Sequence, residues 1–239
     1  MPTWTIVPIR GLASGKTRLA TVLDAAGRLQ LCTRMFDNTI DAVEATFGTL
    51  ARCIVVSADP AARAIAAERG ARTLCDPPDA GLDRALDAAR TSARNAGATQ
   101  LLILSADMPD VDGAVLQALL GQSAPVHPVL FADKRGTGTN GMLLPAGLAL
   151  PFAFGEDSLR RHCTALAALG ARAGRCDDPR LAFDIDTPAD LEAWLRSAAA
   201  AHGGRPVRPR TSPLPSTLRQ AAPTPTPGVE PPAGRSRAP

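Results

Sequence analysis

The chain has 239 residues, of which 45% are hydrophobic, so it is long enough for one sizeable domain with a buried core. The formal net charge of +3 comes from the C-terminal end: residues 201–239 carry six arginines and one glutamate, whereas residues 1–200 carry 20 basic and 22 acidic side chains. The balanced charge of residues 1–200 argues against a nucleic-acid-binding surface.

Membrane insertion and metal-binding cysteines are also disfavoured. No apolar run approaches the roughly 20 residues that span a bilayer, and the N-terminus lacks the pattern of a signal peptide. We therefore expect a cytoplasmic protein without a membrane partner. The five cysteines show no CxxC spacing and the three histidines are scattered, so we expect reduced cysteines and no zinc site.

Short apolar segments alternate with helical segments along residues 1–200. In chain order, the predicted strands cover residues 4–8, 53–57, 72–75, 101–105, 129–132, 142–144 and 181–186. Helices are predicted directly after residue 18, over residues 28–47, 60–69, 82–95, 111–120 and 158–169, and from residue 188 onward. This alternation predicts a mostly parallel α/β sheet with helices on both faces. Residues 201–239 hold ten of the 22 prolines, which predicts a disordered tail outside the domain.

A loop of small and basic residues follows the first predicted strand, in the segment Arg10-Gly-Leu-Ala-Ser-Gly-Lys-Thr-Arg18. Only three residues separate Gly11 from Gly15, whereas a Walker A motif needs four. Close backbone approach and the charges of Lys16 and Arg18 nevertheless suit a triphosphate. The alternative is a solvated basic loop.

Three aspartates stand where strands are predicted to end. Asp107 follows the strand at 101–105, and Asp184 and Asp186 lie two apart in the segment at 181–186, so both would point to the same side of a strand. Carboxylates that converge repel unless a cation lies between them, which favours a Mg²⁺ site. Alternatively, Asp107 caps a turn and Asp186 belongs to the start of the next helix.

Two further polar segments could bind an anion. Gly136-Thr-Gly-Thr139-Asn140-Gly141 lies between two predicted strands, where its glycines allow close backbone approach and its side chains can donate hydrogen bonds. Gly155 and Ser158 precede a helix, whose N-terminus favours phosphate. An ordinary hairpin turn and a simple helix cap are the alternatives.

Taken in order, these motifs resemble one known family. They are Gly-Lys-Thr-Arg-Leu at 15–19, Ser-Ala-Asp-Met-Pro at 105–109, Gly-Thr-Asn at 138–140, Phe-Gly-Glu-Asp-Ser at 154–158 with His162 after it, and Asp-Ile-Asp-Thr-Pro at 184–188. The combination, over about residues 4–197, is similar to the CofC/FbiD guanylyltransferases of coenzyme F-420 biosynthesis, which share their fold with the molybdenum-cofactor guanylyltransferases.

The resemblance implies a Rossmann-like nucleotidyltransferase that joins GMP from GTP to a phosphorylated three-carbon acid and releases pyrophosphate. The acid would be 2-phospho-L-lactate, phosphoenolpyruvate or 3-phospho-D-glycerate. The sequence leaves the oligomeric state open, and a homodimer is possible. The implied Mg²⁺ ligands are Asp107, Asp184 and Asp186. The implied phospho-acid site contains Thr139, Asn140, Gly155 and Ser158. The implied GTP site contains Arg10, Gly11, Lys16, Arg18 and Asp83, with Lys16, Arg18 and Asp107 in catalysis.

The chain departs from the family where Arg10 replaces a frequent Lys, Gly15 a frequent Ala and Asp83 a usual Asn. Two other functions remain open at this point. One is a different nucleotide enzyme, such as a molybdenum-cofactor guanylyltransferase or a sugar transferase that uses Asp184 and Asp186. The other is a catalytically silent nucleotide-binding protein.

Overall fold

The structure is a computed structural model that describes residues 2–76, 81–122 and 127–201. The described residues form a seven-stranded sheet with the order β3-β2-β1-β4-β6-β5-β7. The strands are β1 (Thr3–Pro8), β2 (Cys53–Ser57), β3 (Arg72–Cys75), β4 (Gln100–Leu104), β5 (Val129–Ala132), β6 (Thr139–Pro145) and β7 (Gly174–Cys176). Strand β6 runs antiparallel to β4 and β5, whereas the other neighbouring pairs are parallel. The predicted mostly parallel sheet is confirmed.

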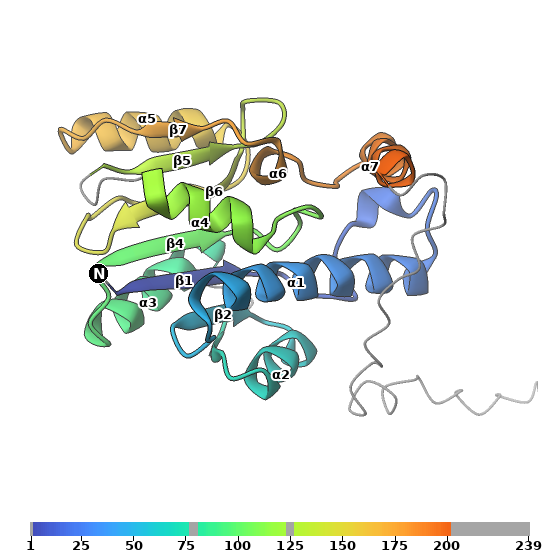
Figure 1. Cartoon of the computed structure of the whole chain (residues 1–239), viewed down its shortest axis with the longest axis horizontal. Helices are drawn as coiled ribbons and strands as arrows, with labels where there is room; N and C mark the ends of the chain where they lie inside the picture. Colours follow the sequence, from blue (N-terminus) through green and yellow to red (C-terminus); the bar gives the residue numbers. More distant parts are fainter. Residues whose placement is uncertain (1, 77–80, 123–126, 202–239) are drawn as a thin grey trace, which may run out of the picture. The chain divides into compact units, whose positions relative to one another are not determined.

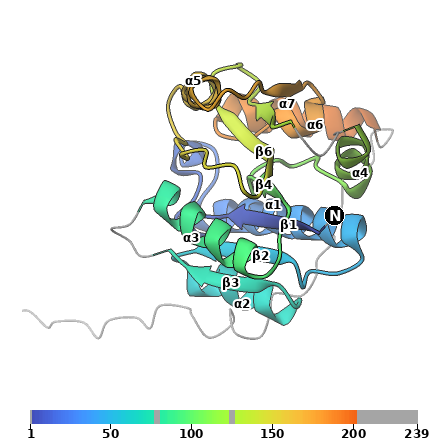
Figure 2. The same ribbon diagram turned by 90° about the vertical axis from the view of Figure 1, so that its left-hand side faces the viewer.

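Helices cover both faces of this sheet (Figure 1). They are α1 (Ala25–Phe47), α2 (Pro60–Glu68), α3 (Leu82–Asn95), α4 (Gly113–Gln122), α5 (Ser158–Ala168), α6 (Pro179–Ala182) and α7 (Pro188–Ala201). Seen along the sheet, α3 and α5 lie on one side and α1 and α4 on the other (Figure 2). Among the described residues, no helix combines the length and the apolar character that a membrane crossing requires.

Local capping interactions determine where several helices begin. The carboxylate of Asp59 accepts a hydrogen bond from Ala61 N at 2.8 Å, and Pro60 occupies the first helical position of α2, as predicted. Helix α4 begins two residues later than predicted because Asp112 Oδ1 accepts from Val115 N and caps it. At α7, Thr187 and Asp190 exchange hydrogen bonds in the manner of a capping box.

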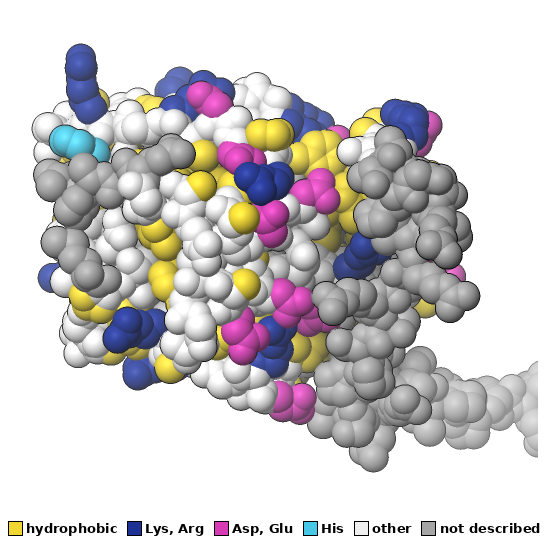
Figure 3. Space-filling view, in the orientation of Figure 1, with side chains coloured by type: hydrophobic (Ala, Val, Ile, Leu, Met, Phe, Trp, Pro, Cys, Tyr) yellow, Lys and Arg dark blue, Asp and Glu magenta, His cyan; other side chains and the backbone are white. Residues whose placement is uncertain are grey.

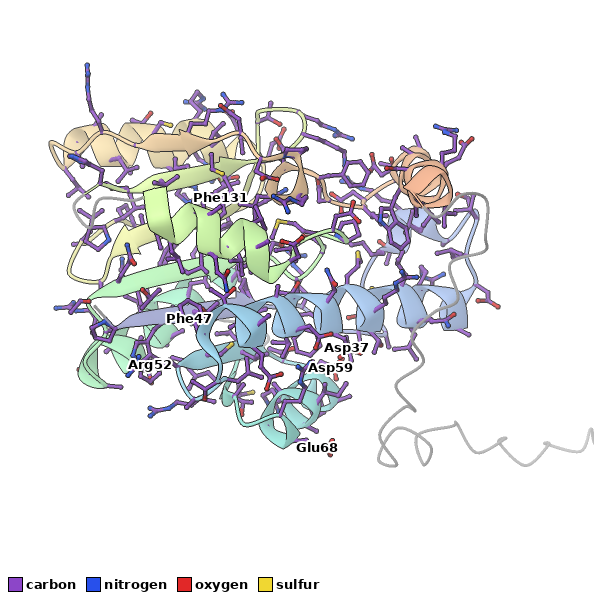
Figure 4. The ribbon with its side chains drawn as sticks, viewed as in Figure 1. Asp37, Phe47, Arg52, Asp59, Glu68 and Phe131 are labelled. Carbon is purple, nitrogen blue, oxygen red and sulfur yellow. The ribbon has the colours of Figure 1, made fainter. Side chains whose placement is uncertain are left out.

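The central strand β4 is apolar on both faces because helices cover both of them. Leu101 and Ile103 belong to the core cluster under α3 and α5, while Leu102 and Leu104 are fully buried on the opposite face. Next to β4, strand β6 needs a glycine. A Cβ atom at Gly141 would lie 2.5 Å from the Ile103 carbonyl oxygen and 2.7 Å from the ring of Phe131, which Figure 4 labels on β5.

Three elements differ from the sequence prediction. Residues 181–186 are not a strand: Leu181 and Ala182 end helix α6, which Asp178 caps and Pro179 starts, and residues 183–186 run on without sheet pairing. Strand β7 was not predicted, because its three residues are largely exposed and carry no apolar pattern. The segment after residue 18 is a single 3-10 turn, Thr17–Leu19, rather than a longer helix.

Acidic and basic side chains are interleaved on the face that carries α1 and α4 (Figure 3). Arg69 pairs with Asp41 and Glu44 of α1, and Arg180 pairs with Asp112 and Asp178. The described side chains of this face therefore form no continuous basic stripe. The predicted tail after Ala201 lies outside the described residues.

Candidate active site

A cavity of about 1110 Å³ lies where loops follow the carboxyl ends of the parallel strands. Ligands of open α/β sheets bind at this edge. Its walls include, among the residues that the sequence singles out, Arg10, Gly11, Lys16, Arg18, Asp107, Thr139, Asn140, Gly155, Ser158, Asp184 and Asp186. The fold therefore brings together segments from both ends of the domain.

The acidic cluster consists of Asp107, Asp184 and Asp186. One oxygen atom of each carboxylate lies within 4.8 Å of those of the other two. Ser105 donates a 2.6 Å hydrogen bond to Asp107, which orients that carboxylate directly after β4. Ile185 N donates to the carbonyl of Asp107 at 3.3 Å, which holds the segment between the other two aspartates against the same loop. The predicted convergence is present, although a non-strand segment rather than strand alternation produces it.

Lys16 lies within this cluster rather than apart from it. Its ammonium is 2.9 Å from Asp107 Oδ2 and 2.7 Å from Asp186 Oδ1, and its side chain is only 10% exposed. The backbone of Lys16 is in the left-handed region, with φ 54°, a conformation that costs a non-glycine residue about 1 kcal/mol. Such strain persists where the surroundings impose it. Burial by itself would lower the pKa of Lys16, but Asp107 and Asp186 raise it above its ordinary value.

A second lysine, Lys134, contacts the other side of the cluster. Its ammonium lies 3.1 Å from Asp184 Oδ1, 2.5 Å from the Asp184 carbonyl oxygen and 3.0 Å from Asp190 Oδ1. Burial by itself would raise the pKa of Asp190, but hydrogen bonds from Thr187 and Lys134 lower it to about 2. Lys134 thus links the acidic cluster to the N-terminus of α7. The sequence prediction missed it, although the chain contains only two lysines, Lys16 and Lys134.

The donor set of the acidic cluster fits a hard divalent cation. Burial and the neighbouring charge of Asp107 raise the pKa of Asp184 against the opposing effect of Lys134, so a further cation at this point would favour the ionised carboxylate. Burial by itself would raise the pKa of Asp186, but the Lys16 ammonium lowers it below its ordinary value. Carboxylate oxygens that bind one Mg²⁺ at about 2.1 Å lie at most about 4.2 Å apart. The three oxygens here lie within 4.8 Å of one another, so small side-chain movements would bring them to that spacing.

The loop after β1 contributes the basic side of the cavity. Leu12 N donates to Asp59 Oδ2 at 2.8 Å, so the helix cap of α2 also fixes this loop (Asp59 is labelled in Figure 4). A Cβ atom at Gly15 would lie 2.9 Å from Cys32 Sγ, so the loop packs directly on α1. Arg10 and Arg18 line the cavity beside it. The loop therefore presents positively charged side chains and accessible backbone to the cavity, although it lacks the Walker A spacing.

The opposite wall is built around Ser158 and a buried histidine. Ser158 Oγ accepts a 2.9 Å hydrogen bond from Thr139 N, which joins the first turn of α5 to β6. His162 Nε2 accepts from Ala153 N at 3.0 Å, so Nδ1 carries the proton and donates to Thr139 Oγ1 at 3.0 Å. Burial lowers the pKa of His162 to about 4. A neutral histidine therefore fixes the Thr139 side chain.

Asn140 and Asp83 have structural partners. The Asn140 side-chain amide lines the cavity but donates to the carbonyls of Leu181 and Ala182 in α6, at 3.2 and 3.0 Å. Asp83 is not among the residues that line the cavity. Its carboxylate accepts a 3.0 Å hydrogen bond from Phe154 N and so holds the loop that contains Gly155. Arg135 and Asp76 also line the cavity and were not predicted.

Comparison with known proteins decides the family. The family model of CofC-like guanylyl transferases matches residues 3–201. The chain belongs to this family.

Relatives with names cover most of the chain. A phosphoenolpyruvate guanylyltransferase from Conexibacter woesei is 37% identical over 206 residues, which are 85% of this chain and 92% of the relative. One from Chloroflexus aggregans is 39% identical over 191 residues, 79% of this chain and 94% of the relative. A solved structure from Desulfovibrio desulfuricans, a proposed nucleotide-diphospho-sugar transferase, superposes with a TM-score of 0.62 at 15% identity, covering 86% of this chain and 91% of the other. That likeness supports the Rossmann-like nucleotidyltransferase fold.

Proposed function

We propose that this CofC-like guanylyl transferase joins GMP from GTP to phosphoenolpyruvate and releases pyrophosphate, as a step of coenzyme F-420 biosynthesis. The observation that carries the proposal is the acidic cluster of Asp107, Asp184 and Asp186 in one cavity with Lys16 and three arginines. Several family relatives bear the name phosphoenolpyruvate guanylyltransferase, which favours this acid over 2-phospho-L-lactate and 3-phospho-D-glycerate.

The reaction needs no protein nucleophile. A phosphate oxygen of phosphoenolpyruvate attacks the α-phosphorus of GTP, the bond from that phosphorus to the bridging oxygen breaks, and pyrophosphate leaves with the electron pair. Because both reactants are anions, the protein must mainly neutralise charge and hold them in line. We assign a Mg²⁺ ion to Asp107, Asp184 and Asp186, where it would polarise the α-phosphate when bound.

The chain's own residues divide the remaining work between two walls. Lys16, Arg10 and Arg18 supply positive charge on the β1 side, where the triphosphate and the departing pyrophosphate need it. On the other side, Thr139, Ser158 and Gly155 form the wall that we assign to the phospho-acid. The glycine at 155 has φ 105°, a conformation that keeps the backbone amides of this turn accessible without a side chain. Asn140 supports this wall through α6.

A substrate panel tests the proposal. The purified full chain is incubated with GTP and Mg²⁺ and with each of the three phospho-acids in turn. Pyrophosphate release is measured and the product is identified by mass spectrometry. We expect release with phosphoenolpyruvate, its loss after chelation of divalent cations and its return when Mg²⁺ is added in excess. Absence of pyrophosphate release with every acid would contradict the proposal, and release with another acid alone would reassign the substrate.

A further inference from the structure

The cavity reaches from the acidic cluster to the edge strand β3, which is farther than a phosphate group would occupy. Its lining includes Val56 on β2, Asp76 after β3 and Leu82 at the start of α3. Strand β3 lies three strands from β4 in the sheet order. Three spacings amount to about 14 Å. The end of the cavity at β3 is therefore available to a group that is attached to the phosphates but distant from them.

Asp76 lies at that end with an unusual environment. Its backbone N–H donates to the Ser57 carbonyl at 3.2 Å, so it continues the parallel pairing of β2 and β3. It comes two residues after Leu74, and side chains two apart on a strand share a face. Leu74, Val56 and Leu82 pack on the same apolar cluster. Asp76 is thus a half-buried carboxylate at the margin of an apolar surface.

One oxygen of this carboxylate lacks a hydrogen-bond donor. Oδ1 of Asp76 is shielded from solvent and has no partner within the part of the chain that the structure describes. A buried acceptor without a donor is costly, so a ligand that supplies one is favoured. By contrast, Asp83 at the start of α3 already accepts from Phe154 N. Rotation about χ2, a soft torsion of Asp, can turn both oxygens of Asp76 toward the cavity.

We infer that Asp76 selects the base of the nucleotide by accepting hydrogen bonds from N1–H and the 2-amino group of guanine. This inference rests on the proposed function, because it places the phosphates of GTP at the acidic cluster. The two donors on one edge of guanine match the two oxygens of a carboxylate. Adenine presents an unprotonated N1 to the same position, and xanthine presents a carbonyl oxygen in place of the 2-amino group, so each would leave a carboxylate oxygen facing a lone pair. Val56 and Leu82 supply apolar surface for a planar ring.

The test replaces one hydrogen-bond acceptor of the Asp76 side chain with a donor. The variant Asp76→Asn keeps the shape but places an NH₂ where one carboxylate oxygen stood, which complements xanthine rather than guanine. Turnover by the full chain with phosphoenolpyruvate is compared for GTP, XTP and ATP, and binding of GTP and XTP is measured by calorimetry. Asp41→Asn is the matched control, because Asp41 pairs with Arg69 at the surface and its side chain is 61% exposed.

We expect the original chain and the Asp41→Asn control to prefer GTP over XTP by about 100-fold or more, since a site built to accept two hydrogen bonds rejects an analogue that lacks one donor. Asp76→Asn should lose this preference and bind XTP more tightly than GTP. An unchanged preference for GTP in Asp76→Asn, or loss of both nucleotides by a folded variant, would overturn the assignment. If the original chain binds GTP without transferring it, the proposed function fails, while the calorimetric preference still decides the role of Asp76.

Discussion

The ammonium of Lys16 lies 2.7 Å from the carboxylate of Asp186, although the two residues are 170 positions apart in the chain. The same ammonium contacts Asp107 at 2.9 Å. A lysine from the loop after β1 therefore stands between two of the three proposed ligands of the metal. If the proposed metal assignment holds, Mg²⁺ and Lys16 would compete for the same carboxylates.

This competition gives the first prediction. Replacement of Lys16 by Met removes the internal counter-ion, so the acidic cluster should bind Mn²⁺ or Mg²⁺ more tightly in the absence of nucleotide, by about tenfold. Turnover should fall nevertheless, because the triphosphate loses a cation. Calorimetric titration with Mn²⁺ measures the first effect and pyrophosphate release the second. Weaker metal binding by Lys16→Met would show that Lys16 supports the cation site rather than competing with it.

The second prediction concerns the cluster itself. Asp186→Asn should reduce turnover by about 100- to 1,000-fold, because a carboxylate that organises the charge at the α-phosphate is lost. The fold should persist, since Lys16 keeps its contact with Asp107. Pyrophosphate release and thermal unfolding, compared with the surface variant Asp41→Asn, check both parts. Near-normal release by the folded variant would refute the assignment of Asp186 to the metal.

The third prediction concerns Lys134 as a positioning residue. Lys134→Met leaves Asp184 without its cation and loosens the link to Asp190 and α7. Residues that orient metal ligands typically change metal affinity by about 10- to 100-fold. We expect a rise of this size in the Mg²⁺ concentration needed for half-maximal turnover, with partial rescue by Lys134→Arg. A fall in turnover that saturating Mg²⁺ leaves unchanged would argue against the positioning role.

The fourth prediction is a pH dependence of stability that arises from His162. Its pKa is lowered to about 4 in the folded chain, from an ordinary value of 6.5, mainly by burial, while Asp83 raises it and Arg161 lowers it further. Between these values the unfolded chain binds a proton that the folded chain does not, so stability falls as pH decreases from 6.5 toward 4 and is unaffected by this group above 6.5. The full effect is about 3 kcal/mol. Denaturant unfolding at pH 5 and pH 7 should show a larger difference for the original chain than for His162→Gln. Equal differences would contradict the assignment.

The fifth prediction tests the packing of β6. Gly141→Ala would place a methyl group against the Ile103 carbonyl and the Phe131 ring, at distances that real contacts do not reach. We expect a loss of about 1–3 kcal/mol in unfolding free energy, as for other overpacked cores. Gly147→Ala is the matched control, because nothing lies within 4 Å of a Cβ atom at that position. Thermal unfolding of the two variants measures the difference.

Local signals in the sequence predict the elements whose ends are set by nearby residues. Asp59 and Pro60 place the start of α2 correctly, because a cap acts within three residues of the helix that it begins. Asp184 and Asp186 show the limit of such signals. Their apolar neighbours suggested a strand, but the caps at Asp178 and Thr187 start helices on both sides, and the short stretch between them gains no sheet partner. Strand β7 was missed because its pairing with β5 depends on backbone contacts that leave no side-chain pattern.

The residue types that line the candidate site can be read from the sequence, but the contacts among them cannot. The acidic residues and the basic loop were found because their chemistry is visible in the sequence. The contacts of Lys16 with Asp107 and of Lys134 with Asp184 join segments 91 and 50 residues apart, and only the strand order brings those segments together. The same holds for Asp76, whose significance lies in a missing partner rather than in a motif.

The scarcity of lysine has a practical consequence. Both lysine side chains of the sequence contact the acidic cluster, so acylation of lysine within this sequence takes place at that cluster. Amine labelling followed by peptide mass analysis would therefore report directly on ligand occupancy. Protection or exposure of Lys16 on addition of GTP and of a divalent cation would follow the state of the cavity without any engineered probe.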